Sequence, residues 1–205
     1  MLTIRELETA DPKCVAEIAA LHRRAFPAFF LTQLGLPFLK TLYACYLKDP
    51  NSGILLAEED GSVRGFLAWS KDYPGFYRNL IRHHIVEFAF CSLLAVLRHP
   101  SFTKRLLGAF KKSDSVVKTE RYVELSSICV DPAAEGRGIG SKLIERLKEA
   151  TDFSAFAYIN LETDADDNEG ANRFYLKNGF QLARTYTTAE GRRMNEYRYA
   201  PEATV

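Results

Sequence analysis

The chain has 205 residues, 47% of them hydrophobic and 26% charged, which is typical of one domain that buries its own core. Its 27 basic and 26 acidic residues give a net charge of +1, which argues against a general nucleic-acid binder. Ordinary counts of 12 glycines and 8 prolines exclude disordered and fibrous classes.

Four cysteines lie far apart among apolar neighbours, so we expect reduced thiols packed in the core. They are Cys14, Cys45, Cys91 and Cys129. The N-terminus has no apolar signal core, and the longest apolar stretch, residues 85–97, is shorter than the roughly 20 residues that a membrane span needs. We therefore expect a cytoplasmic protein without a membrane span.

In chain order, the first patterns are those of a strand and two helices. Residues 2–8 alternate apolar and polar side chains with period 2, as a strand does. Asp11 followed by Pro12 is typical of a helix N-terminus. A second helical stretch, about 32–48, contains Pro37, where we expect the helix to restart.

A hairpin and a helical insertion come next. Residues 53–60 and 62–70 are apolar runs joined by a turn, which predicts a β-hairpin. Residues 72–119 then interrupt the pattern, with a turn-rich start, a helix over 78–98 and a shorter amphipathic helix over 102–112.

Strands and helices alternate again after the insertion. The predicted elements are a strand (121–130), a helix (138–151), a strand (153–163), a helix (171–177) and a closing hairpin (181–188 and 192–200). The sequence therefore predicts one domain, residues 1–205, of the α/β (α+β) class, with a mixed sheet and a helical insertion.

One strand–loop–helix junction carries a candidate anion site. Residues 123–147 read VELSSICVDPAAEGRGIGSKLIERL, and Gly138 and Gly140 remove side chains where a ligand must approach the backbone. The N–H groups of the first helical turn, with the helix dipole, favour an anion there, most naturally a pyrophosphate. The loop is neither a Walker A loop nor a full GxGxxG pattern, so by itself it is equally consistent with a plain turn.

A second motif, about thirty residues later, makes the pattern specific. Residues 168–180, NEGANRFYLKNGF, contain five residues at fixed spacing: Asn168, Ala171, Tyr175, Gly179 and Phe180. Together with the glycine loop, this motif resembles the GNAT superfamily of N-acetyltransferases, whose patterns read [QR]-x-x-G-x-[GA] and N-x-x-A-x-x-x-Y-x-x-x-G-F. The resemblance covers roughly residues 2–71 and 120–200. It implies a mixed, mostly antiparallel central sheet flanked by helices.

The resemblance also implies a cosubstrate, acetyl-CoA, with no metal. The implied cofactor-binding residues are Ile128, Cys129, Val130, Gly136, Arg137, Gly138, Ile139, Gly140, Ser141 and Asn168. In the family, the end of this strand pairs with the pantetheine arm through backbone groups, and the Val130 N–H would be the donor to the oxyanion. Asn168 would contact the cofactor, or cap the next helix with its side chain. Glu135 departs from the Gln or Arg of the family, and its carboxylate is unfavourable beside a pyrophosphate unless it turns into solvent.

Acetylation of an amine requires a base, because an amine with a pKa of about 10.4 is protonated at neutral pH. Glu124 is the implied base, and strand alternation predicts that Glu124, Ser126, Ile128 and Val130 share one side of the strand. Tyr175 is the implied general acid, which protonates the departing thiolate. The structural alternatives are an ordinary exposed carboxylate for Glu124 and a buried aromatic for Tyr175.

The insertion is the basic part of the chain. Residues 78–112 carry a net charge of +6, so the remainder carries −5. One hypothesis is a wall or lid for an acceptor with phosphate or carboxylate, such as a nucleotide-linked amino sugar. The alternatives are an apolar face packed on the domain or on a second copy in a homodimer, and docking onto an anionic membrane surface.

The sequence thus favours an acetyl-CoA-dependent N-acetyltransferase that transfers acetyl directly to the primary amine of a small molecule. Two other functions stay open: a non-catalytic acyl-CoA-binding or interaction module, and a protein-lysine acetyltransferase. Glu124 and Tyr175 together favour the enzyme.

Overall fold

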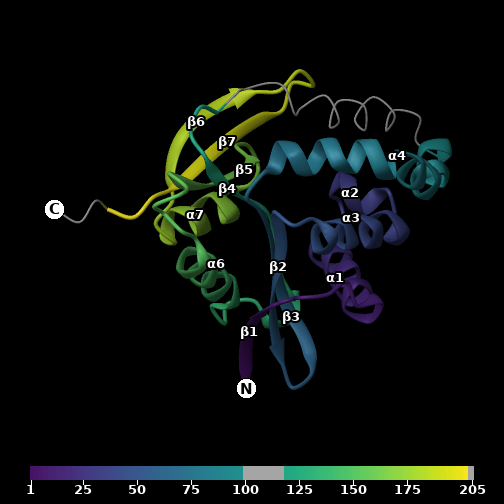
Figure 1. Ribbon diagram of the computed structural model, residues 1–205, viewed down its shortest axis with the longest axis horizontal. Helices are drawn as coiled ribbons and strands as arrows, with labels where there is room; N and C mark the ends of the chain where they lie inside the picture. The colour runs from purple at the N-terminus through teal and green to yellow at the C-terminus, as the bar shows by residue number, and fades with distance from the viewer. Residues whose placement is uncertain (99–117, 203–205) are drawn as a thin grey trace.

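The computed structural model describes residues 1–98 and 118–202 (Figure 1). Within them, seven strands form one sheet in the order β1-β2-β3-β4-β5-β7-β6. The strands are β1 (Leu2–Glu6), β2 (Ser52–Glu59), β3 (Ser62–Ser70), β4 (Tyr122–Val130), β5 (Tyr158–Asp164), β6 (Gln181–Thr187) and β7 (Arg193–Tyr199). Only the β4–β5 pair is parallel among these strands, which confirms the predicted mixed, mostly antiparallel sheet.

Helices cover both faces of the sheet. They are α1 (Pro12–Ala25), α2 (Phe30–Gln33), α3 (Leu36–Lys48), α4 (Tyr73–Arg98), α6 (Ile139–Ala150) and α7 (Glu169–Lys177). Helices α1 to α4 lie on one side, the α1 face, whereas α6 and α7 lie on the other, the α6 face (Figure 1). Each face has its own apolar core, so the sheet is a wall between two packed layers.

The predicted helix starts can be compared with the structure residue by residue. The Asp11 side chain accepts a hydrogen bond from the Cys14 N–H at 3.0 Å, which confirms that it caps α1. The restart near Pro37 is also confirmed, because Gly35 takes a left-handed φ of 97° and α3 begins at Leu36.

The turn-rich start predicted for the insertion was wrong. Helix α4 begins already at Tyr73, because Asp72 accepts a hydrogen bond from the Gly75 N–H at 3.0 Å and Pro74 lies in the first turn. The predicted second helix, over 102–112, lies outside the described residues. The strand predicted over 153–163 begins only at Tyr158, since turns around Asp152 occupy its first part.

The cysteines are free thiols, as expected. Cys45 and Cys129 are buried, and Cys14 and Cys91 are half-buried. In the described part of the chain, no helix combines the length and the apolar character that a membrane crossing requires.

Candidate active site

Strands β4 and β5 separate after a short parallel stretch, and this opening organises the site. They pair over three residues only, from Tyr122 opposite Tyr158 to Glu124 opposite Asn160. Beyond that point β5 pairs with β7 on its other side, and the described ladder pairs join β4 only to β3. The second half of β4 therefore presents backbone groups to a gap between the two strands.

A β-bulge in β4, beside this gap, shifts the alternation of its side chains between the two faces of the sheet. Trp69 of β3 pairs with Leu125 and Ala68 pairs with Ser127, so Ser126 is the extra residue. Ahead of the bulge Leu125 packs in the core of the α6 face, and after it Ile128 packs there. The prediction that Glu124 shares a side with Ile128 and Val130 was therefore wrong, because Glu124 lies on the α1 face and those two on the α6 face.

The backbone of Val130 points into the gap. The Asp131 N–H donates to the Arg64 carbonyl at 2.8 Å, so it faces β3. Successive peptide groups of a strand point to opposite edges. The N–H and C=O of Val130 and of Ile128 consequently face the side that β5 has left, where an extended ligand can pair with them.

The glycine loop ends in an open helix N-terminus. Gly138 is the N-cap of α6 with a left-handed φ of 74°, and no side chain among the described residues hydrogen-bonds the cap. A Cβ on Gly138 would have no neighbour within 4 Å, so the space beside the first-turn N–H groups is free. This cradle fits the diphosphate of coenzyme A, because those N–H groups have no partners within the helix.

Two charged residues of the glycine loop, Arg137 and Glu135, have surroundings that the sequence did not predict. Arg137 donates to the Glu59 carboxylate of β2 at 2.9 Å, and its guanidinium holds the pKa of that carboxyl below its usual range. Arg137 thus ties the loop to the β2–β3 hairpin in this state. Glu135 is exposed to solvent, so its carboxylate can turn away from the α6 N-terminus into water.

Glu124 stands where the two strands part. Its side chain is buried, so it is not an ordinary exposed carboxylate. The Asn160 amide donates a hydrogen bond of 2.7 Å to the Glu124 carboxylate. Sequence reasoning missed Asn160, which carries no motif; only the strand pairing brings it to Glu124.

Tyr175 lies in α7 on the α6 face. It is almost fully buried, with its ring against Phe174, Phe180 and Tyr197. Burial raises the pKa of Tyr175 to about 12, so its hydroxyl keeps its proton at neutral pH. Tyr175 is therefore a buried aromatic residue, as the structural alternative expects. Its protonated phenol can nevertheless serve as an acid.

Two other predicted cofactor residues have defined surroundings. Asn168 precedes α7, but its side chain does not cap the helix; it donates to the Thr163 hydroxyl at 2.7 Å and to the Asp164 carbonyl at 3.3 Å. The capping alternative was wrong, because this amide binds the end of β5 instead. Cys129 is buried on the α1 face, and burial raises the pKa of its thiol to about 12, so it is no nucleophile at neutral pH.

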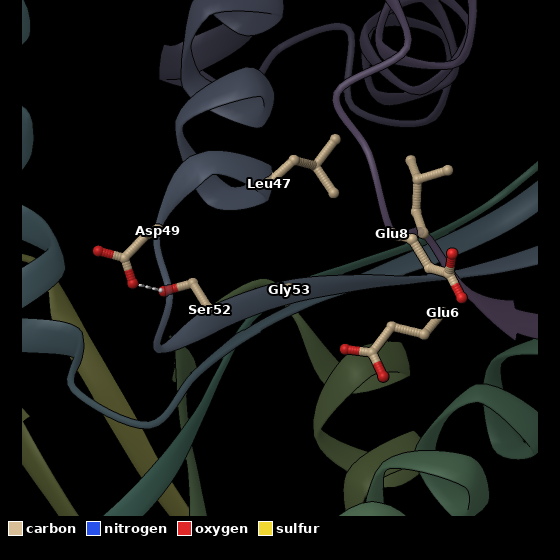
Figure 2. A pocket seen from close by; sticks show the side chains of 7 residues that line it. Glu6, Glu8, Leu47, Asp49, Ser52 and Gly53 are labelled. Atoms are coloured by element: carbon tan, nitrogen blue, oxygen red, sulfur yellow. Dashed lines mark hydrogen bonds between the residues drawn. The ribbon is translucent and has the colours of Figure 1, made fainter.

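Two surface hollows lie away from the glycine loop. One, of about 400 Å³, lies between the end of β1, the end of α3 and the start of β2, and is lined by Glu6, Glu8 and Asp49 among others (Figure 2). The Ser52 hydroxyl donates to Asp49 there at 2.9 Å. The other, of about 410 Å³, includes Tyr73 and Tyr122. No cluster of three metal-ligating side chains occurs among the described residues.

Comparisons with known proteins agree with this geometry. The family model of the acetyltransferase (GNAT) family matches residues 15–180. A search of curated protein sequences finds no match. Among solved structures, an N-acetyltransferase from Staphylococcus aureus Mu50 superposes with a TM-score of 0.61 at 18% identity, covering 97% of this chain and 98% of that one.

Two further structures share the fold. The ribosomal-protein-S18-alanine N-acetyltransferase of Escherichia coli gives a TM-score of 0.58 at 18% identity, covering 100% of this chain and 99% of that one. YncA from Salmonella typhimurium, solved with its cofactor acetyl-CoA, gives 0.59 at 16% identity, covering 100% and 96%.

A sheet opened between two parallel strands, beside a glycine-capped helix, can hold the extended arm and the diphosphate of coenzyme A. The chain belongs to the acetyltransferase (GNAT) family. This membership makes the chain an acetyltransferase and confirms the resemblance seen in the two sequence motifs.

Proposed function

We propose that the enzyme transfers acetyl directly from acetyl-CoA to a primary amine of a small acceptor. The observation that carries this proposal is the opening between β4 and β5, with a buried carboxylate at its apex and backbone donors along one edge. Direct transfer needs a base beside the attacking nitrogen and an acid beside the departing sulfur. Glu124 on the α1 face and Tyr175 on the α6 face are our candidates for these two roles.

Each residue has one role in the proposal. Acetyl-CoA supplies the activated acetyl thioester. The N–H groups of Ile139, Gly140 and Ser141 hold the diphosphate, with Gly136, Arg137 and Gly138 shaping the loop. Backbone groups of Ile128 and Val130 pair with the pantetheine arm, and Cys129 links these two residues in the strand. Asn168 fixes the turn between β5 and α7.

The chemical step uses three groups. Glu124 takes a proton from the acceptor ammonium, which frees the nitrogen lone pair for attack. The Val130 N–H donates a hydrogen bond to the carbonyl oxygen as negative charge develops there. Tyr175 then gives its proton to the departing sulfur.

The acceptor's charge is a separate proposal. Arg78 and Arg82 are exposed on α4, on the α1 face where Glu124 lies. We propose that they favour an acceptor with a phosphate or carboxylate, such as an amino sugar derivative. The other basic residues of the insertion lie where no side chain is described, and a homodimer or membrane contact through 78–112 stays a prediction.

A steady-state assay with a panel of amines tests the proposal. Release of coenzyme A, corrected for hydrolysis, is measured for the wild type and for Glu124→Gln. Loss of the base should lower kcat by about 100-fold or more while acetyl-CoA binds as before. The control is Glu58→Gln, which removes a carboxylate that binds Arg5 on the outer strands and should keep full activity.

Three results would contradict parts of the proposal. Full activity of Glu124→Gln would remove Glu124 from the mechanism. Tight acetyl-CoA binding without turnover of any amine would favour the binding module, and peptide acetylation detected by mass spectrometry would favour a protein-lysine acceptor.

A further inference from the structure

Asn160 has an unusual hydrogen-bonding state. Its side chain is completely buried, and its Oδ1 has no hydrogen-bond partner among the described residues. Its Nδ2 donates to Glu124 at 2.7 Å. A carboxylate can only accept, so the amide nitrogen must face Glu124 and the carbonyl oxygen must face elsewhere. Buried carbonyl oxygens without a partner are rare in folded proteins, and this one calls for a donor.

The position of Asn160 shows where that donor would come from. Asn160 and Glu124 form the last rung of the β4–β5 ladder before the strands part. Ile159 and Leu161 pack on the α6 face, so Asn160 lies on the α1 face, together with Glu124. The unpaired oxygen is thus next to the proposed base, at the apex of the gap.

Four other titratable groups lie near Glu124, and none of them can take its role as the base at neutral pH. They are Tyr46 of α3, Tyr73 of α4, Tyr122 of β4 and Tyr158 of β5. Burial raises the pKa of each phenol, so all four stay protonated and neutral around the carboxylate.

We propose that Asn160 is a specificity-determining residue for the acceptor nitrogen, and this rests on the proposed function of Glu124 as the base. Acetylation converts R–NH3⁺ into R–NH–CO–CH3 as the N–C bond forms and the C–S bond breaks. One proton passes from nitrogen through Glu124 to solvent, and a second passes from nitrogen to solvent as the amide forms. Tyr175 regains from solvent the proton that it gives to sulfur. The third stays on nitrogen and donates to Asn160 Oδ1.

This arrangement selects primary amines. A secondary amine gives an amide without an N–H, which leaves the buried Asn160 oxygen without a donor. A site built to hydrogen-bond an N–H rejects an analogue that lacks it, because its own polar group is then left unpaired. The Asn160 amide meanwhile holds the Glu124 carboxylate in place, so Asn160 also acts as a positioning residue.

The test needs no knowledge of the natural acceptor. Two thioethers imitate the product complex: S-(N-methylcarbamoylmethyl)-coenzyme A has one amide N–H, and its N,N-dimethyl analogue has none. Calorimetry should show that the wild type binds the first about tenfold more tightly. Asn160→Leu, similar in size but without polar atoms, should bind both equally.

A matched control and a second readout separate this role from a structural one. Asn195→Leu removes an asparagine of β7 that donates to Asn172 at 2.9 Å, and it should keep the wild-type preference. Carboxyl ¹³C NMR, assigned with Glu124→Gln, should show a higher Glu124 pKa in Asn160→Leu, since a hydrogen bond to the charged form is lost.

The outcomes are distinguishable. Equal affinities of the wild type for the two thioethers, or an undiminished preference in Asn160→Leu, would overturn the inference while leaving Glu124 as the base. If neither thioether nor coenzyme A binds the wild type, the proposed function falls and this inference with it.

Discussion

Replacing Gly138 by alanine should separate the cofactor cradle from the stability of the fold. Gly138 has a φ of 74°, and a Cβ there would meet nothing within 4 Å. The change therefore brings no clash, only the left-handed conformation, which destabilises an alanine by about 1–2 kcal/mol. For a chain of this size, each kcal/mol lowers Tm by about 2–4 °C.

Gly191 is the matched control. It lies in the β6–β7 turn with a φ of 83° and the same open space around its Cβ. Gly138→Ala and Gly191→Ala should therefore lose similar stability in thermal unfolding. Only Gly138→Ala places a methyl group where a diphosphate must approach the α6 N–H groups.

The affinity for coenzyme A should fall only in the first variant. Loss of one hydrogen bond to a charged group weakens binding by about 1.5–3 kcal/mol, or roughly 10–100-fold. Calorimetry on both variants measures this difference. Equal coenzyme A affinities in Gly138→Ala and Gly191→Ala would refute the assignment of the cradle to the start of α6.

Two other predictions concern protons. Tyr175→Phe should lower kcat about 100-fold without changing acetyl-CoA affinity, and because the pKa of Tyr175 is about 12, the wild-type kcat should show no alkaline fall up to pH 10. Burial lowers the pKa of His22 to about 4, so the unfolded chain binds more protons than the folded one between pH 6.5 and 4. Stability should fall by about 2 kcal/mol from pH 8 to 5 in denaturant titrations, and His22→Gln should remove that part of the loss.

The sequence predicted the order of the elements and the glycine loop before α6 well, because those depend on local signals. These signals are Pro12 and Pro37, the turn between β2 and β3, and the glycines before α6. Each of them shapes the backbone within a few residues. Their physical effect on the backbone does not depend on the rest of the fold.

The arrangement around the base could not be predicted in the same way. Strand alternation fails at Ser126, because a bulge depends on how β3 pairs with β4 and leaves no mark in either strand alone. Asn160 is 36 residues from Glu124, and only the parallel register brings them together. The capping role of Asn168 failed for a related reason, since Thr163 of β5 competes for its amide.

If the pantetheine arm pairs with β4 as proposed, the opening between β4 and β5 makes the cosubstrate a structural part of the sheet. Without it, the amides of Ile128 and Val130 face the gap between the strands, and we expect them to exchange hydrogen with water faster than the β4 amides that are paired with β3. A pantetheine arm lying in the gap acts as an eighth strand, so slowed exchange of Ile128 and Val130 would report that the sheet has become continuous. On this proposal, catalytic turnover would break and restore the continuity of the sheet once per acetyl group transferred.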